Sequence, residues 1–253
     1  MRLRIAYLYP EIMNIYGDRG NIIALTQRCL WRGIPVSVDN VTLNQDFNWE
    51  KYDLFFGGGG QDRQQSLVAR DLQKKESKLK QAAQAGKVFL LICGTYQLFG
   101  HYFKTAEGKK IPGIGILDLI TVASKKRKIG NVLIKLEART CLRRQGYKLK
   151  ADTLVGFENH SGNTFINQSG QTKPLGTVVK GFGNNGQDKT EGAVYEQVYG
   201  TYLHGSLLPK NPHFADLLIQ TALETRYRRK ITLQPLDDTL EWQAHRFAAN
   251  LIK

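Results

Sequence analysis

The sequence predicts an α/β fold, in which a central, mostly parallel sheet is flanked by helices on both faces. Three observations support this class. Strand-like and helix-like segments alternate over the first hundred residues. Residues 87–92 form an apolar run typical of a strand that is buried on both sides. Apolar residues make up 42% of the 253-residue chain and charged residues 23%, which is the composition of a folded globular protein.

The elements of the first hundred residues follow from hydrophobic spacing and turn residues. Residues 2–9 alternate and are rich in β-forming side chains, so they predict a first strand that Pro10 ends. Asn21 is expected to cap a helix that runs to Gly33, because apolar residues follow it at helical spacing. The next segments are predicted as strand, strand, helix, strand and helix: residues 36–38, 52–56, 64–85, 87–92 and 95–103.

The second half of the chain has a different secondary-structure pattern. From Ile111 to about Gly205, strand-like segments alternate with Gly and Asn turns, and two helices are predicted near residues 213–229 and 240–251. Neither an internal repeat nor a linker-like tract interrupts the sequence. Residues 1–253 are therefore interpreted as a single domain, with the motifs in residues 3–208 and C-terminal helices in residues 212–252.

Cysteine content and hydropathy bear on metal binding and location. The three cysteines, Cys29, Cys93 and Cys141, are odd in number and widely spaced, so neither a disulfide framework nor a metal site is predicted. No apolar run approaches the ~20 residues of a membrane-spanning helix. The N-terminus reaches Tyr9-Pro10 too early for a signal-peptide core, so a cytoplasmic protein is expected.

A net charge of +14 indicates an anionic partner or surface, or simply a solvated basic face. The segment Lys125–Lys150 carries ten basic residues and one acid, Glu137. It is expected to contact a protein partner or the anionic inner face of the membrane. Nucleic-acid binding is disfavoured, because this segment has a single aromatic residue, Tyr147, and so offers no stacking platform.

The clearest chemical feature is Cys93, which follows the apolar strand directly and precedes a helical stretch. This order is typical of a nucleophile elbow, in which a sharp turn lifts the nucleophile out of the sheet. The free N–H groups of the following helix favour the thiolate, and Gly94 lets the backbone approach an oxyanion. A buried structural cysteine is the competing interpretation.

The run Gly57–Gly60 also follows a predicted strand, so it is expected at the same sheet edge as Cys93. Gly58 and Gly59, with Gly94, are predicted to form an oxyanion hole through their backbone N–H groups. A flexible turn is the alternative. A phosphate cradle is disfavoured, because no Gly-Lys-Ser/Thr follows the run.

A cysteine nucleophile requires a base, and two histidines compete for this role. His204 ends a β-rich stretch at a Gly turn, and His160 lies in the segment Gly156-Phe157-Glu158-Asn159-His160-Ser161-Gly162. Spacing alone does not choose between them. His101 is predicted two turns along the helix after Cys93, roughly 12 Å away, and therefore out of reach.

Taken together, these motifs resemble a known family. Ile92–Leu98 and Gly200–Gly205 resemble the class I glutamine amidotransferases of the cobyric-acid-synthase-like (CobB/CobQ-like) branch. Within that branch, the chain is most similar to the GatD-type glutaminase subunits of lipid II isoglutaminyl synthases. This narrower resemblance rests on motifs that occur in order along the chain: Tyr9-Pro10, residues 14–21, Gly57–Gly60, Arg127 before Ile129-Gly130-Asn131, and residues 156–162.

The resemblance implies a class I amidotransferase fold and an enzyme that hydrolyses L-glutamine. Carried over residue by residue, Cys93 is the nucleophile, His204 the base, and Arg127 and Gln97 the binders of glutamine. The ammonia would pass to a Mur-ligase-like, MurT-type partner in a heterodimer. That partner would hold ATP and Mg²⁺ and would amidate the D-glutamate of lipid II during peptidoglycan synthesis, and no cofactor is expected in this chain.

The sequence departs from the family pattern at two positions. Leu91 stands where a small residue is common, and Ser206 stands where many class I enzymes carry a Glu. No orienting acid is therefore obvious beside His204, which predicts a Cys–His dyad. Asp18, Glu158 or an acid from the partner are weak candidates for that role. Two other functions stay open: an amidotransferase of cobalamin-type synthesis, or a catalytically inactive basic binding module on the same scaffold.

Overall fold

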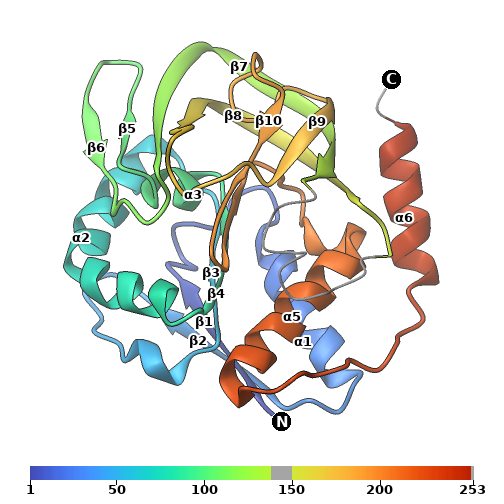
Figure 1. Ribbon diagram of the computed structural model, residues 1–253. Coiled ribbons are helices and arrows are strands. Elements are labelled where there is room, and N and C mark those ends of the chain that lie inside the picture. Colours follow the sequence, from blue (N-terminus) through green and yellow to red (C-terminus); the bar gives the residue numbers. More distant parts are fainter. Residues whose placement is uncertain (138–149, 252–253) are drawn as a thin grey trace.

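A computed structural model describes residues 1–137 and 150–251, which include two six-stranded sheets (Figure 1). The first sheet has the strand order β11-β12-β4-β3-β1-β2. All its neighbouring pairs are parallel except β11 with β12. In this order, the strands span Ala193–Tyr195, Val198–Thr201, Val88–Ile92, Leu54–Gly57, Leu3–Leu8 and Val36–Val41.

The three central strands β3, β4 and β12 are buried along their whole length, as their apolar sequences require. Their register brings the strand ends together: Gly57 pairs with Leu91, and Thr201 pairs with Ile92. The residues that follow these strands therefore emerge at one edge of the sheet. This is the arrangement that the sequence predicts for the glycine run and Cys93.

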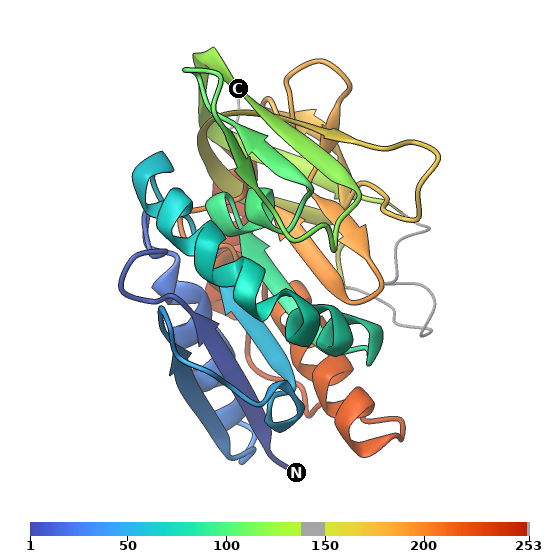
Figure 2. The same cartoon turned by 90° about the vertical axis from the view of Figure 1, so that its left-hand side faces the viewer.

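Helices cover both faces of the first sheet (Figures 1 and 2). Helices α1 (Arg19–Leu30) and α5 (Pro212–Tyr227) lie on one face, and the long helix α2 (Asp62–Gln84) lies on the other. A capping box between Gln61 and Gln64 satisfies backbone donors at the start of α2. Other helical elements of the described residues are the two short 3₁₀ turns η1 and η2 and helix α6, which span Trp49–Lys51, Leu208–Lys210 and Thr239–Asn250.

The second sheet lies over the C-terminal edge of the first (Figure 1). Its order is β10-β9-β7-β5-β6, and β8 pairs with the long strand β7. A backbone bridge between Phe157 and His204 joins β8 to the segment after β12. Along the sheet, the strands span Thr190–Glu191, Gly176–Lys180, Leu119–Leu136, Tyr102–Lys104 and Lys110–Pro112, and β8 spans Thr153–Ile166.

The α/β class and the order of elements are confirmed, and two local predictions are wrong. Helix α3 after the elbow spans only Gly94–Leu98, because the chain turns at Gly100, where a Cβ atom would lie 2.8 Å from the Leu119 carbonyl oxygen. His101 thus lies beyond the helix, exposed and 2.8 Å from Asp118. Asn21 does not cap α1, which begins at Arg19; its side chain instead accepts a hydrogen bond from the Leu208 backbone.

Cys141 and residues 138–149 of the basic segment lie outside the described residues. A membrane-spanning candidate does not occur among the helices of residues 1–137 and 150–251, which are too short or too polar. The interpretation of residues 1–253 as a single domain stays a prediction.

Candidate active site

Cys93 occupies the sharp turn between β4 and α3. Its backbone has φ 51° and ψ −103°, a conformation that non-glycine residues rarely adopt. The Cys93 N–H donates to the Thr201 carbonyl at 2.8 Å, which fixes the turn to strand β12. Glycine follows because a Cβ atom at Gly94 would lie 3.0 Å from the Gly60 nitrogen. The strained backbone is thus held by its neighbours, as expected for a nucleophile elbow.

His204 lies beyond the end of β12, and an acid of this chain contacts it. Its Nδ1 atom lies 3.1 Å from Oδ1 of Asp18, and both side chains are fully buried. The other carboxylate oxygen of Asp18 accepts a hydrogen bond from the Gly59 N–H at 2.7 Å. The expected dyad therefore has a third member, since Asp18, one of the weak candidates, lies where an orienting acid lies in a catalytic triad.

The charges around His204 favour its protonated form. Burial opposes protonation, but the Cys93 thiolate charge and the hydrogen-bonded Asp18 carboxylate outweigh it and raise the pKa of His204 to about 10. The Nε2 atom of His204 has no hydrogen-bond partner among the described residues. An imidazolium held in this way is ready to donate a proton to a leaving group at Cys93.

A pocket of about 390 Å³ opens beside Cys93, whose side chain is 6% exposed. Both predicted substrate-binding residues line it. Arg127 lies within the irregularity between Ala123 and Lys128 in the pairing of β7 with β8, and its guanidinium donates to Asn159 and Tyr16 at 2.6 and 2.8 Å. Gln97 donates to the Tyr202 hydroxyl at 2.9 Å, while its buried Oε1 has no described partner.

The structure corrects part of the predicted oxyanion hole. The Gly59 N–H is engaged by Asp18, so it is not available to an oxyanion. Neither Gly58 nor Gly59 lines the pocket beside Cys93, whereas Gly60 does. The Gly94 N–H opens α3 and is one of the amides that a helix leaves unpaired. Within the glycine run, Gly59 therefore holds Asp18 and Gly60 lines the pocket. The sequence alone does not show which glycine has which contact.

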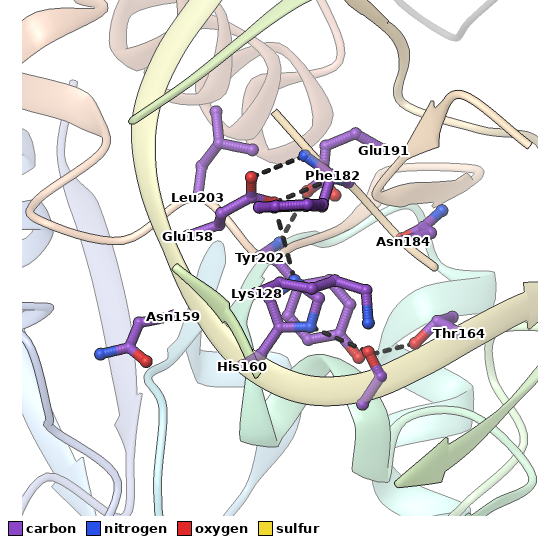
Figure 3. Close-up of polar contacts among 12 residues, drawn as sticks. Lys128, Glu158, Asn159, His160, Thr164, Phe182, Asn184, Glu191, Tyr202 and Leu203 are labelled. Atoms are coloured by element: carbon purple, nitrogen blue, oxygen red, sulfur yellow. Dashed lines mark hydrogen bonds and ion pairs between the residues drawn. The ribbon is translucent and has the colours of Figure 1, made fainter. Parts of the chain in front are cut away.

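The rival base His160 belongs to a separate buried cluster (Figure 3). Its ring stacks on Tyr202 with 3.6 Å between centroids, and its Nδ1 lies 2.9 Å from the Gly162 carbonyl oxygen. Burial lowers the pKa of His160 despite the nearby Glu158 carboxylate. His160 also lines the pocket, as a neutral wall residue.

Glu158 does not orient His204. Its two carboxylate oxygens accept hydrogen bonds from the backbone N–H groups of Phe182 and Gly183, at 2.7 and 2.9 Å. It lies 3.7 Å from His160, in the same buried cluster (Figure 3). Within residues 1–137 and 150–251, no group of three or more His, Cys, Asp or Glu side chains is placed to hold a metal ion.

Comparison with known proteins agrees with this geometry. The sequence pattern of the CobB/CobQ-like glutamine amidotransferase domain matches residues 4–212. The chain belongs to this family. It is 41% identical over 240 residues to the GatD subunit of the glutamine-hydrolysing lipid II isoglutaminyl synthase of Streptococcus pneumoniae, covering 94% of this chain and 87% of that one. The Staphylococcus aureus GatD subunit is 38% identical over 244 residues, covering 96% and 93%.

More distant relatives of this amidotransferase share part of their length or the fold. A probable cobyric acid synthase of Methanococcus maripaludis is 31% identical over 187 residues, which cover 69% of this chain but only 34% of that protein. The solved structure of PurLQS from Thermotoga maritima matches with a TM-score of 0.62 at 18% identity, over 90% of this chain and all of that one. A solved glutamine amidotransferase matches with a TM-score of 0.53 at 10% identity, over 86% and 98% of the two chains.

Proposed function

We propose that this protein hydrolyses L-glutamine as the GatD-type subunit of a lipid II isoglutaminyl synthase. The observation that carries the proposal is the placement of Cys93 at a strained elbow, at the wall of a pocket that Arg127 and Gln97 also line. His204 and Asp18 form a buried pair that interacts electrostatically with the Cys93 thiol. A binding module without catalysis would not need this arrangement.

The chemistry uses the thiolate and the imidazolium in sequence. The Cys93 thiolate attacks the side-chain amide carbon of glutamine, and a tetrahedral oxyanion forms. His204 donates its proton to the amide nitrogen, so that the carbon–nitrogen bond breaks, ammonia leaves and a thioester remains. His204 then takes a proton from water, and the resulting hydroxide attacks the thioester to release glutamate and the thiolate. Asp18 holds the imidazole orientation throughout.

The pocket residues account for recognition of the amino acid. Arg127 offers its guanidinium to the α-carboxylate, because a planar donor fork matches a carboxylate. The unpaired Oε1 of Gln97 accepts from the α-ammonium group. The Gly94 and Gly60 N–H groups are the candidate donors to the oxyanion, because Gly94 directly follows Cys93 at the start of α3 and Gly60 lines the pocket.

The partner is the acceptor of the ammonia. The GatD relatives are named as subunits, and they match almost the whole chain, which supports the existence of a second subunit. That this subunit is Mur-ligase-like and of the MurT type is part of the proposal. In this proposal ATP and Mg²⁺ bind to that subunit, which amidates the D-glutamate of lipid II. Docking at the inner membrane face through basic residues such as Lys125 and Lys126, both exposed, belongs to the same proposal.

The test is ammonia release combined with covalent labelling. Wild-type protein should release ammonia from glutamine, and diazo-oxo-norleucine should add to Cys93, whereas Cys93→Ala should do neither. Cys29 is the matched internal control, because it is fully buried and burial raises the pKa of its thiol to about 12. A label found by mass spectrometry on Cys29 or Cys141 would contradict the assignment of the nucleophile.

A second assay tests the partner. The complex, supplied with ATP, glutamine and lipid II, should amidate lipid II, and the partner should raise the glutaminase rate by ordering the loops around Cys93. Because Asp18 already orients His204, the partner is not required to supply a carboxylate. Charge reversal at Lys125 and Lys126 should weaken association more at low salt than at high salt. Amidation of a cobyrinate acceptor instead of lipid II would favour the cobalamin-type alternative.

A further inference from the structure

The loop that carries Asp18 and the loop that carries His204 touch at several points besides the pair itself. Residues 14–21 and 204–208 are nearly 190 positions apart in sequence, yet the Ser206 hydroxyl donates to the Gly17 carbonyl oxygen at 2.5 Å. The Leu208 N–H donates to the buried Asn21 side chain at 2.9 Å. The edge of the Tyr16 ring approaches the His204 ring with 5.1 Å between centroids.

Ser206 makes its contact from an unfavourable backbone conformation. Its φ is +49°, in the left-handed region that favours glycine, and it directly follows Gly205, whose φ is +70°. A non-glycine side chain is held there by the interaction that its hydroxyl makes. The Ser206–Gly17 hydrogen bond is therefore a specific feature of this turn, and not a by-product of an unstrained loop.

Gly20 leaves the space that Ser206 occupies. A Cβ atom at Gly20 would lie 2.0 Å from the Ser206 Oγ and 2.8 Å from its Cβ. The Gly20 N–H also donates to the Gly17 carbonyl at 2.9 Å, so the two residues share one acceptor. Residues Gly17, Gly20 and Asn21 thus form the surface against which the 204–208 loop packs.

Hydrogen bonds matter here because the Asp18 loop has little apolar anchorage. Asp18 is fully buried, but Tyr16, Gly17 and Arg19 on either side of it are exposed. Gly17 adjoins Asp18 directly, so a displacement of the Gly17 carbonyl displaces the carboxylate that contacts His204. A bond that holds Gly17 therefore acts on the distance between Asp18 and His204, together with the Gly59 N–H that binds the other carboxylate oxygen.

We infer that Ser206 is a positioning residue for the glutaminase reaction, because its bond to Gly17 holds Asp18 in hydrogen-bonding contact with His204. The inference rests on the proposed function. Ser206 does not line the substrate pocket, so its loss should lower kcat and leave KM for glutamine unchanged. We expect a decrease in kcat on the order of tenfold, within the range that a general base contributes.

Three variants separate the bond from the strain. Ser206→Ala removes the bond and keeps the side-chain strain, Ser206→Gly removes both, and Gly20→Ala displaces the Ser206 hydroxyl without changing Ser206. All three should lower kcat. The matched control is Ser66→Ala on α2, where the serine hydroxyl also donates to a backbone carbonyl, that of Asp62, at 3.2 Å. Ser66→Ala should leave kcat and KM unchanged.

A double-mutant cycle distinguishes positioning from general destabilisation. If Ser206 acts through Asp18, Ser206→Ala should change kcat less than about twofold in an Asp18→Asn background, whereas a structural effect would be additive. Thermal unfolding of each variant verifies the fold. If the wild type is active and Ser206→Gly is equally fast, or if the effects in the cycle are additive, the inference about Ser206 is wrong. The proposed function would not be affected by either result. A wild type that releases no ammonia and is not labelled at Cys93 would overturn the proposed function itself, and this inference with it.

Discussion

Two of the buried histidines of this protein, His204 and His160, each lie beside a carboxylate, and they differ in charge. His204 lies 3.1 Å from Asp18, and its pKa is raised, whereas His160 lies 3.7 Å from Glu158, and burial lowers its pKa. The difference arises from what else each group contacts. Glu158 is held by two backbone N–H groups, and His160 stacks on Tyr202, while His204 also interacts with the Cys93 thiolate. A nearby acid alone does not raise the pKa of a buried histidine; for His204 the second charge, that of Cys93, and the hydrogen bond to Asp18 do so.

Replacing His204 and His160 one at a time by alanine should give the largest difference in kcat. His204→Ala should lower kcat for glutamine hydrolysis by ~10²–10⁴-fold, because the proton donor to the leaving ammonia is lost. His160→Ala should lower kcat much less, because it removes a wall of the pocket and a stacking partner of Tyr202. Steady-state kinetics on both folded variants measure this. A folded His160→Ala that is the slower of the two would reverse our assignment of the base.

Asp18→Asn should lower kcat by roughly 10²-fold or less, since the imidazole loses its orienting charge. Steady-state kinetics on the folded variant measure this.

The same variant should also change how the unfolding free energy depends on pH. The charges of Cys93 and Asp18 raise the folded-state pKa of His204 from 6.5 to about 10, so their interactions with His204 stabilise the folded protein below about pH 6.5, and this contribution is lost as the pH rises through about 10. The difference in unfolding free energy between wild type and Asp18→Asn should therefore be larger at pH 6 than at pH 10. Chemical denaturation at both pH values measures it, and an equal difference would contradict the coupling.

Arg127 should affect binding of the substrate and not the chemical step. Arg127→Ala should raise KM for glutamine by about 10–100-fold with a smaller change in kcat, as expected for loss of a charge-assisted hydrogen bond to a carboxylate. Arg127→Lys should recover part of the loss, because it keeps the charge without the fork. Asn159→Ala, which removes one of the two side chains holding Arg127, should also raise KM for glutamine, but by a smaller factor.

The smallest effect concerns a third buried carboxylate. Glu191 accepts hydrogen bonds from the Thr201 hydroxyl and the Tyr202 N–H, both at 2.7 Å, and burial raises its pKa from 4.5 to about 7. The folded protein therefore keeps a proton that the unfolded chain releases, and stability falls as the pH rises from about 4.5 to about 7. Glu191→Gln should remove up to about 3 kcal/mol of this pH dependence. Unfolding free energies at pH 5 and pH 8 test it, and an unchanged slope would show that Glu191 does not titrate in that range.

The parts of the site that the sequence predicts are those set by local pattern. Cys93 and the run Gly57–Gly60 follow apolar strands, and parallel strands bring such ends to one edge, so their proximity followed from the fold class. Spacing left His204 and His160 open as the base, and only the family resemblance favoured His204. Asp18 had no such signal, because its contact with His204 joins positions 186 residues apart in loops whose docking depends on single hydrogen bonds. The role of Gly59 was obscured for the same reason: the partner of its N–H group is set by tertiary contact.

The helix after Cys93 shows the same limit in the fold. Residues 95–103 have helical spacing, but α3 ends at Leu98, because Gly100 packs against the Leu119 carbonyl. The end of α3 is therefore determined by a contact with strand β7, which begins almost twenty residues later, and not by local helix propensity. Bounds of the long, strongly patterned elements were predicted closely, as for α2 and β4.

The position of β12 bears on when the enzyme first becomes active during its synthesis. Strand β12 enters the sheet between β4 and β11, and its Thr201 carbonyl holds the Cys93 backbone. A nascent chain that has emerged from the ribosome only as far as residue 190 therefore contains the nucleophile on a strand with one open edge, without its base. The Cys93 backbone is therefore fixed, and His204 is brought to the sheet edge, only after the last strand of this sheet has been added.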